Sequence, residues 1–184
     1  MRSTPVPEPV PEPVPAPGLE PVGDLAARLI ADLVAAGHSV ATAESLTGGL
    51  VVATLIDVPG ASAVVTGGIV AYQDEVKTAL LGVSAAVLLE RGAVCVEVAE
   101  ALATGARERL GATWGVGTTG VAGPGPAAGV PAGTVFVAVA GPGGVSARAL
   151  SCTGSRAQVR AAAVAGALQL LSDLLTSATT HPRP

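Results

Sequence analysis

Aromatic side chains, cysteine and histidine are nearly absent from this 184-residue chain. Aromatic residues make up 2% of the sequence and hydrophobic residues 49%, so any core must consist of small aliphatic side chains. The two cysteines, Cys95 and Cys152, lie far apart without a CxxC spacing, and the two histidines are His38 and His181. This supply of ligands argues against a disulfide framework and against a zinc site. We therefore expect neither a metal nor any other cofactor.

Charged residues are also scarce, and their balance is slightly acidic. With a formal net charge of −4, the chain does not suggest the basic surface that nucleic-acid binding requires, so we expect no nucleic-acid partner. The uncharged run between Arg109 and Arg148 is interrupted by four prolines and many glycines, which favours a buried core over a membrane span. No apolar signal segment opens the chain, and we accordingly expect a cytoplasmic protein without a membrane partner.

The first part of the chain is rich in proline. Residues 1–21 contain a Val-Pro-Glu-Pro repeat, which favours polyproline II and cannot bury enough apolar surface to fold alone. We predict that residues 1–21 and 178–184 are disordered tails. Residues 22–177 are then numerous enough for one domain with a substantial core.

Helical and strand-like patterns alternate through the rest of the sequence. Asp24, Asp74 and Ser155 are expected to cap helices. Helices are predicted from Asp24 to Gly37, from Gly49 to before Pro59, from Asp74 to Leu81, from Val96 to Leu110 and from Ser155 to about Leu175. A further short helical segment is predicted to begin at Ser84. Strands are predicted at residues 39–43, 64–71, 113–121, 134–140 and 145–152, and the last two form a hairpin. This order indicates a single three-layer α/β/α domain with a mixed sheet.

The turn that follows the first predicted strand carries a serine close to two glycines. Ser45 leads into Thr47-Gly48-Gly49 and then a helix, so its hydroxyl lies near backbone N–H groups at the positive end of that helix. Such an arrangement either holds an anion or stabilises the oxyanion that forms when a serine attacks a carbonyl group. The alternative is a serine N-cap with glycines that allow tight packing. Neither histidine is a credible base, so a nucleophilic Ser45 needs another activator.

The chain has a single lysine, Lys77, five positions after its single tyrosine, Tyr72. The other strongly basic side chains of the sequence are arginines. An arginine stays charged, whereas a partly desolvated lysine can release its proton near neutral pH. Lys77 and Tyr72 are therefore the one unusual pair available to activate Ser45. The alternative is that Lys77 is an ordinary solvated residue of a helix.

Five short motifs appear in order along the predicted domain. They lie at residues 43–49 (AESLTGG), 71–77 (AYQDEVK), 119–124 (TGVAGP), 131–135 (PAGTV) and 154–160 (GSRAQVR). Together they closely resemble the CinA C-terminal domain family over residues 24–176, and stand-alone members of that family are nicotinamide mononucleotide deamidases. Larger members also carry a nucleotide-pyrophosphatase-like domain, which has no counterpart in this sequence.

The resemblance implies a hydrolase that acts on a small-molecule nucleotide. The reaction would be hydrolysis of the carboxamide of nicotinamide mononucleotide to nicotinic acid mononucleotide and ammonia, in pyridine nucleotide salvage. Ser45 would attack the amide carbon, Lys77 would take its proton and help to deliver one to the leaving ammonia, and Tyr72 would support the proton relay or orient the ring. The family also suggests a homodimer or a larger homo-oligomer.

Substrate-binding residues also follow from the resemblance. The N–H groups around Thr47, Gly48 and Gly49 would hold the oxyanion or another anionic group of the substrate. The loop that begins at Thr119 and Gly120 would line the nucleotide pocket.

A nucleotide phosphate also requires a cation. By the resemblance Arg160 is the best match to the family's arginine, and Arg156 is the second. For either residue the alternative is a solvated position on a helix. The sequence departs from the family at residues 125–129, where relatives usually have an acidic residue and a longer polar loop.

Two other functions stay open at this point. The chain would use the same Ser/Lys chemistry on another amide, or it would be a catalytically silent nucleotide-binding module linked to competence and DNA damage, the context for which the family was named. The joint presence of Ser45, Tyr72 and Lys77 argues against the silent module, because binding alone does not need all three.

Overall fold

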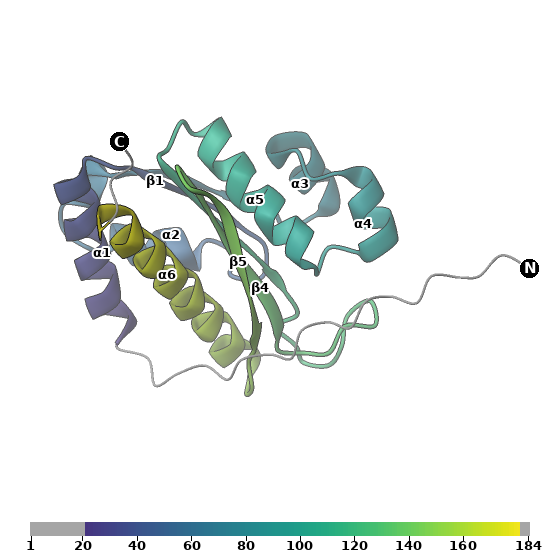
Figure 1. Ribbon diagram of the computed structural model, residues 1–184. Coiled ribbons are helices and arrows are strands. Elements are labelled where there is room, and N and C mark those ends of the chain that lie inside the picture. Colours follow the sequence, from purple (N-terminus) through teal and green to yellow (C-terminus); the bar gives the residue numbers. More distant parts are fainter. Residues whose placement is uncertain (1–20, 181–184) are drawn as a thin grey trace, which may run out of the picture.

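A five-stranded sheet separates two layers of helices (Figure 1). The computed structural model describes residues 21–180, so most of the tails predicted at 1–21 and 178–184 lies outside the described part. Residues 178–180, which were predicted to belong to a disordered tail, are helical. The strands are β1 (Val40–Glu44), β2 (Val65–Val70), β3 (Trp114–Gly120), β4 (Thr134–Gly141) and β5 (Gly144–Ser151). One face of the sheet carries α1 (Val22–Ala36), α2 (Leu50–Ile56) and α6 (Arg156–Thr180), with the short 3-10 helix η1 (Ala61–Ala63) after α2. The other face carries α3 (Asp74–Leu81), α4 (Ala85–Arg91) and α5 (Val96–Arg109).

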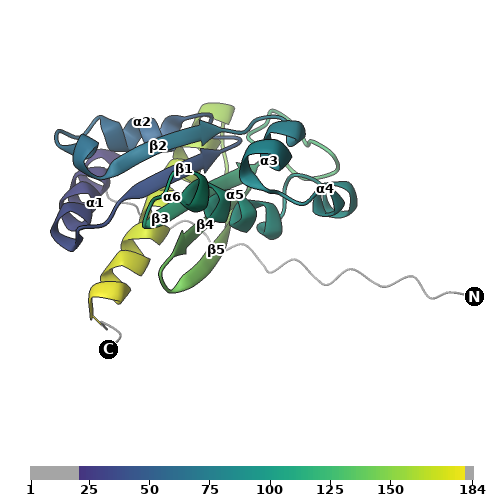
Figure 2. The same ribbon diagram turned by 90° about the horizontal axis from the view of Figure 1, so that it is seen from above.

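The strand order is β2-β1-β3-β4-β5 (Figure 2). β1 pairs in parallel with both β2 and β3, whereas β3, β4 and β5 pair antiparallel. The parallel part needs helical crossovers, and the antiparallel part needs only the two-residue turn between Gly141 and Gly144. The predicted three-layer α/β/α domain with a mixed sheet is therefore confirmed.

The core consists of aliphatic side chains and closely packed backbone. Leu29 of α1, Leu55 of α2 and Leu168 of α6 lie fully buried in one cluster under the sheet. On the opposite face, α5 lies almost against β3, because Gly115 and Gly117 have no side chains to keep it away. This close approach explains how a core with so few aromatic residues fills its volume.

Gly117→Ala is expected to lower the free energy of unfolding by about 1–3 kcal/mol, because the added methyl group overpacks this contact. A Cβ at Gly117 would overlap the carbonyl oxygen of Ala99 and lie 2.6 Å from the amide nitrogen of Ala103, both in the backbone of α5. Gly143→Ala is the matched control, since nothing lies within 4 Å of its Cβ position. Urea unfolding of the two variants measures the difference, and equal stabilities would contradict the packing account.

Left-handed glycines and a capping box mark several helix boundaries, and the sequence prediction was wrong at others. Gly37 adopts a left-handed conformation and closes α1, as predicted. Ser155 and Gln158 form a reciprocal capping box at the start of α6, with N–H to side-chain distances of 2.8 and 3.4 Å. However, α1 begins at Val22, and α3 begins at Asp74 with Gln73 as N-cap, so the predictions that Asp24 and Asp74 are N-caps were wrong. α6 also continues five residues beyond the predicted end near Leu175, since no glycine or proline interrupts it there.

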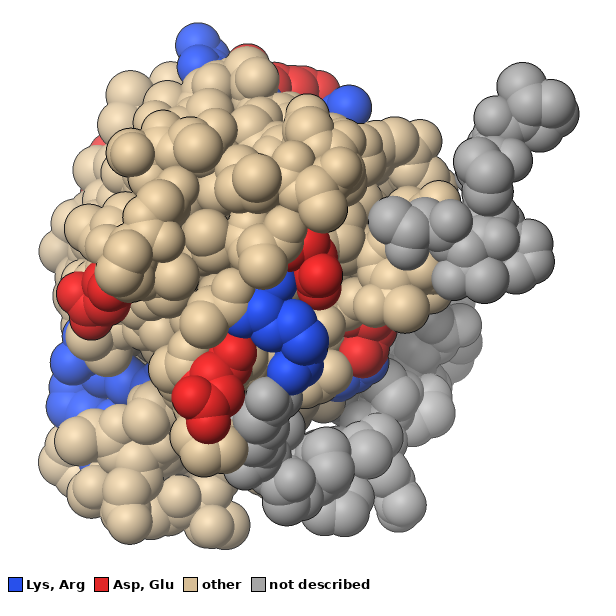
Figure 3. Space-filling model, turned by 90° about the vertical axis from the view of Figure 1, so that its left-hand side faces the viewer, with Lys and Arg blue, Asp and Glu red and all other residues tan. Residues whose placement is uncertain are grey.

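Within the described residues, α6 is the one helix long and apolar enough to cross a membrane. It lies against α1 and β4, and 56% of that apolar stretch is buried, as is usual for a core helix. The uncharged run between Arg109 and Arg148 forms β3, β4 and the start of β5 instead of a span. On the face shown in Figure 3, charges of both signs lie interspersed among uncharged described residues.

Candidate active site

Three parallel strands end at one edge of the sheet and bring the predicted site residues together. In the register Glu44 of β1 lies opposite both Val70 of β2 and Thr118 of β3. Ser45 and Tyr72 therefore leave the sheet at the same edge. The crossover from β1 to β2 runs through α2 on one face, and the crossover from β2 to β3 runs through α3–α5 on the other. The carboxyl ends of β1 and β3 thus form a topological switch point, where open α/β sheets usually bind ligands.

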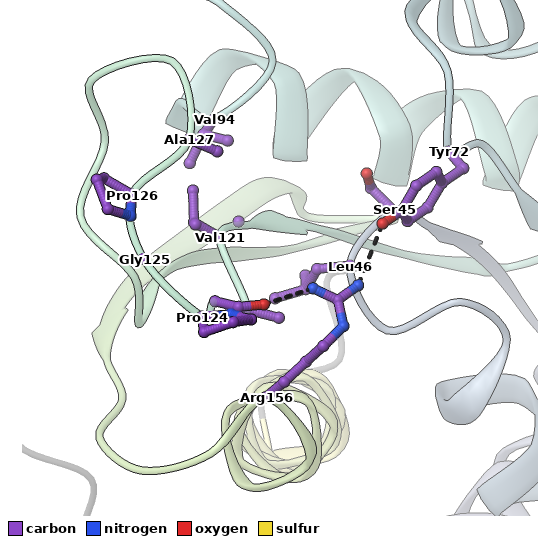
Figure 4. Close-up of a pocket in the computed structure, with 13 residues that line it drawn as sticks. Ser45, Leu46, Tyr72, Val94, Val121, Pro124, Gly125, Pro126, Ala127 and Arg156 are labelled. Atoms are coloured by element: carbon purple, nitrogen blue, oxygen red, sulfur yellow. Dashed lines mark hydrogen bonds between the residues drawn. The ribbon is translucent and has the colours of Figure 1, made fainter.

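A pocket of about 210 Å³ opens at this edge (Figure 4). Ser45 and Tyr72 border one side, the loop with Val121 and Pro124 borders the other, and Arg156 reaches in from the start of α6. The lining consists of Ser45, Leu46, Tyr72, Val94, Arg156 and residues 120–127. The cavity is open to solvent and mixes a hydroxyl, a phenol and a guanidinium with apolar surface.

Ser45 is held in place by backbone and side-chain contacts of the turn that it begins. Its side chain lines the pocket, the residue is 9% exposed, and its N–H donates to the carbonyl of Thr118 at 3.0 Å. On the far side of the turn, Arg160 donates from Nε to the Leu46 carbonyl at 2.9 Å and from Nη2 to the Thr47 carbonyl at 2.6 Å. The hydroxyls of Thr47 and Thr118 lie 2.7 Å apart. The turn is therefore a firmly bonded part of the domain.

The N–H groups of this turn differ in their availability. The Gly49 N–H donates to Glu44 Oε2 at 2.9 Å, so this group is not free to hold an oxyanion, as the resemblance had implied. The N–H groups of Leu46, Thr47 and Gly48 have no acceptor among residues 21–180. Of these three residues Leu46 lines the pocket, so its N–H is the candidate donor for a developing negative charge beside Ser45.

Lys77 is buried, with 1% of its surface exposed, and is therefore not an ordinary solvated residue. Its Nζ donates to the backbone carbonyl of Tyr72 at 3.0 Å and to Asp74 Oδ1 at 2.9 Å. These two partners use two of the three N–H groups of an ammonium. Within the described residues no hydrogen bond joins Lys77 directly to Ser45.

The pairing of β1 and β2 places Ser45 close to the segment that binds Lys77. The Ala71 N–H donates to the carbonyl of Glu44 at 2.8 Å, which continues the pairing of β1 and β2 by one step. Ser45 is the next residue after Glu44, and Tyr72, whose carbonyl binds Lys77, is the next after Ala71. Lys77 and Ser45 are thus linked through two adjacent chain segments rather than through a direct contact.

Arg156 spans the mouth of the pocket. Its Nη1 donates to the Gly123 carbonyl at 2.7 Å, and its Nη2 donates to the Tyr72 hydroxyl at 3.2 Å. Tyr72 is 56% exposed, so its ring forms part of the rim (Figure 4). A guanidinium placed at an open pocket is suited to bind an anionic group in two-pronged fashion.

Residues 23–175 match the family described as CinA C-terminal domain. This chain belongs to that family. A CinA-like protein of Frankia casuarinae is 48% identical over 143 residues, which are 78% of this chain and 33% of that protein. A CinA-like protein of Anaeromyxobacter sp. is 50% identical over 149 residues, which are 80% of this chain and 36% of that protein. The chain thus spans about a third of the length of the curated relatives it matches.

Solved structures of the family share the fold over nearly their whole length. The competence/damage inducible protein CihA from Agrobacterium tumefaciens superposes with a TM-score of 0.79 at 39% identity, over 83% of this chain and 94% of that chain. A CinA superfamily protein from Klebsiella pneumoniae superposes with a TM-score of 0.83 at 32% identity, over 86% of this chain and 99% of that chain. The α/β fold of this CinA C-terminal domain is therefore the fold of its solved relatives.

Five predicted substrate-binding residues of the CinA C-terminal domain do not line the pocket: Thr47, Gly48, Gly49, Thr119 and Arg160. The Thr119 hydroxyl is buried and donates to the Ala93 carbonyl at 2.6 Å, so that Gly120 rather than Thr119 lines the cavity. Arg160, the preferred candidate for the phosphate, binds carbonyls of the Ser45 turn instead. Arg156, the second candidate, is the arginine that lines the pocket.

Sequence reasoning assigned no role to Glu44, although it lies within the AESLTGG motif. An acidic residue shortly before a helix start is a recognisable signal, because helix N-termini favour negative charge. Val94 also lines the pocket, and no feature of the sequence predicts this position.

Both cysteines are buried free thiols, and burial raises the pKa of Cys95 and of Cys152. Among the described residues, no group of three His, Cys, Asp or Glu side chains is arranged to hold a metal ion.

Proposed function

We propose that this CinA C-terminal domain hydrolyses the carboxamide of nicotinamide mononucleotide to nicotinic acid mononucleotide and ammonia. The observation that carries the proposal is the convergence of Ser45, Tyr72 and Arg156 on one pocket, with the buried amine of Lys77 bound to the Tyr72 carbonyl. A hydroxyl nucleophile, a proton carrier and an anion-binding cation are the groups that amide hydrolysis of a nucleotide monophosphate requires.

The proposed reaction has two steps. In the first, Ser45 Oγ attacks the amide carbon, its proton passes to the Nζ amine of Lys77, and the C–N bond breaks as that proton goes to the leaving ammonia. In the second, water attacks the resulting ester, the acid is released, and the proton returns to Ser45. The N–H group of Leu46, which lines the pocket and has no acceptor among residues 21–180, supports stabilisation of both oxyanions.

Tyr72 and Asp74 have supporting parts in this scheme. The ammonium that forms at Lys77 after proton uptake is received by the Tyr72 carbonyl and the Asp74 carboxylate, which already bind Nζ. The Tyr72 ring at the rim offers a surface for the pyridine ring of the substrate.

Ammonia release from nicotinamide mononucleotide by the purified protein tests the proposal. Nicotinamide, which lacks the ribose phosphate, and glutamine serve as comparison amides, and we expect turnover of the nucleotide to exceed both. Turnover of another amide alone would indicate a different amidohydrolase. Thermal stabilisation by the nucleotide without ammonia release would indicate a silent binding module.

Arg156→Ala is expected to raise the KM for nicotinamide mononucleotide about 10- to 100-fold, because a charge-assisted contact of roughly 1.5–3 kcal/mol to the phosphate is lost. Its kcat should change much less, since the phosphate is remote from the amide. Arg148→Ala is the control, because Arg148 is an exposed arginine paired with Asp173. Steady-state kinetics separate the two parameters.

Arg160→Ala is the informative contrast to Arg156→Ala. Loss of Arg160 should lower kcat and stability together, because two carbonyls of the Ser45 turn lose their donor. A selective rise in KM in Arg160→Ala, with none in Arg156→Ala, would instead support Arg160 as the phosphate ligand.

A further inference from the structure

Glu44 is a fully buried acid at the last position of β1, directly before Ser45. Its Oε2 accepts the N–H groups of Gly49 at 2.9 Å and Val51 at 3.0 Å. Its Oε1 accepts the N–H of Val52 at 2.8 Å and the hydroxyl of Thr42 at 3.1 Å. All four partners are donors, and no ion pair among the described residues includes Glu44.

This carboxylate takes the place of an ordinary helix cap. The first N–H groups of a helix lack partners within the helix, and α2 receives no side-chain cap from Gly49 at its start. Glu44 reaches across from the end of the strand and satisfies three N–H groups in the first turn. The end of β1 and the beginning of α2 are thereby fixed to each other, with residues 45–48 held between them.

The Ser45 turn is consequently held from two sides. The Glu44 carboxylate binds N–H groups at its end, and the Arg160 guanidinium binds the carbonyls of Leu46 and Thr47. Burial of an unpaired carboxylate is costly, and here hydrogen bonds to the backbone offset that cost. A hydrophobic residue at position 44 would leave those N–H groups, which are buried or partly buried, without acceptors.

We propose that Glu44 is a positioning residue that holds the hydroxyl of Ser45 and the N–H groups beside it in reactive geometry. The proposal rests on the proposed function in which Ser45 is the nucleophile. Glu44 does not line the pocket, so it acts through the turn and not through contact with substrate. Displacement of a reacting group by about 1 Å can reduce a rate about 100-fold, which sets the size of the effect.

Glu44→Gln keeps the size of the side chain but places an NH₂ group against backbone donors. We expect kcat for nicotinamide mononucleotide to fall about 100-fold while KM changes less than about threefold. Glu44→Asp, which keeps the carboxylate, should recover part of the rate. Leu55→Ala is the stability control, because Leu55 is a buried residue in the last turn of α2, the helix whose first N–H groups bind Glu44. Its Tm should fall, while its kcat, measured well below Tm, stays near that of the wild type.

A second measurement does not depend on the natural substrate. A fluorophosphonate probe forms a bond from phosphorus to Ser45 Oγ and releases fluoride, and intact-mass spectrometry gives the rate. We expect Glu44→Gln to react at least about tenfold more slowly than the wild type. Thr42→Val, which removes one donor to Glu44, should show a smaller decrease and provides the test where Glu44→Gln does not fold.

The two measurements separate the two proposals. Labelling of wild-type Ser45 without turnover of the nucleotide would overturn the proposed substrate and still test Glu44 through the labelling rates. Wild-type rates of labelling or of turnover in folded Glu44→Gln would overturn the positioning role. An equal loss of rate in Leu55→Ala would overturn the positioning role as well, since the loss would then follow from lower stability of the fold. Absence of both reactions in the wild type would overturn both proposals.

Discussion

Ser45→Ala is expected to reduce ammonia release from nicotinamide mononucleotide at least about 10³-fold, because the substitution removes the atom that forms the covalent bond. The pocket itself should remain, since the contacts of the turn are made by backbone groups and by Glu44, Thr47 and Arg160. The nucleotide should therefore still raise the Tm of the variant. Steady-state rates and a thermal shift measured on the same sample check both parts.

Ser172→Ala is the matched control for this experiment. Ser172 is a serine of nearly equal burial in α6, 8% exposed against 9% for Ser45, and it does not line the pocket. Its variant should keep the wild-type rate. Turnover by Ser45→Ala within tenfold of the wild type would exclude covalent catalysis by Ser45. It would favour direct attack by water activated at Lys77.

The fold was largely predictable from local patterns. Glycines at helix ends and the alternation of apolar runs located the strands and helices to within a few residues, and the hairpin around residues 141–144 predicted the antiparallel pairs. The start of α1 was missed because Pro21 precedes it as N-cap without a side-chain hydrogen bond. The first residue of that helix thus carries no polar signal.

The site was predictable in its residues but less so in its contacts. Arg156 and Arg160 are four residues apart and so share one face of α6, yet the sequence does not tell which of them reaches the pocket. That depends on which loops lie above each turn of the helix. The burial of the Thr119 hydroxyl against Ala93 depends likewise on a contact between segments 26 residues apart.

Replacement of Lys77 by methionine is expected to lower kcat about 10²- to 10⁴-fold, the usual contribution of a positioned acid–base group. Methionine fills a similar volume with an unbranched chain, so the buried site should stay packed. The Tyr72 carbonyl would lose its donor, which is expected to lower the free energy of unfolding by about 1–3 kcal/mol. The Asp74 side chain is 53% exposed and can be hydrated once its partner is gone. Stopped assays of ammonia and urea unfolding measure the two effects.

Lys77→Arg separates proton transfer from electrostatic support. Arginine keeps the positive charge near Tyr72 and Asp74 but does not release its proton, so it cannot act as the base for Ser45. If Lys77 carries the proton, the arginine variant should be nearly as inactive as the methionine variant while retaining more stability. If Lys77 only supplies a fixed charge to the pocket, arginine should restore much of the rate. The absence of a direct Ser45–Lys77 hydrogen bond among the described residues makes this comparison decisive, because proximity alone does not distinguish the two roles.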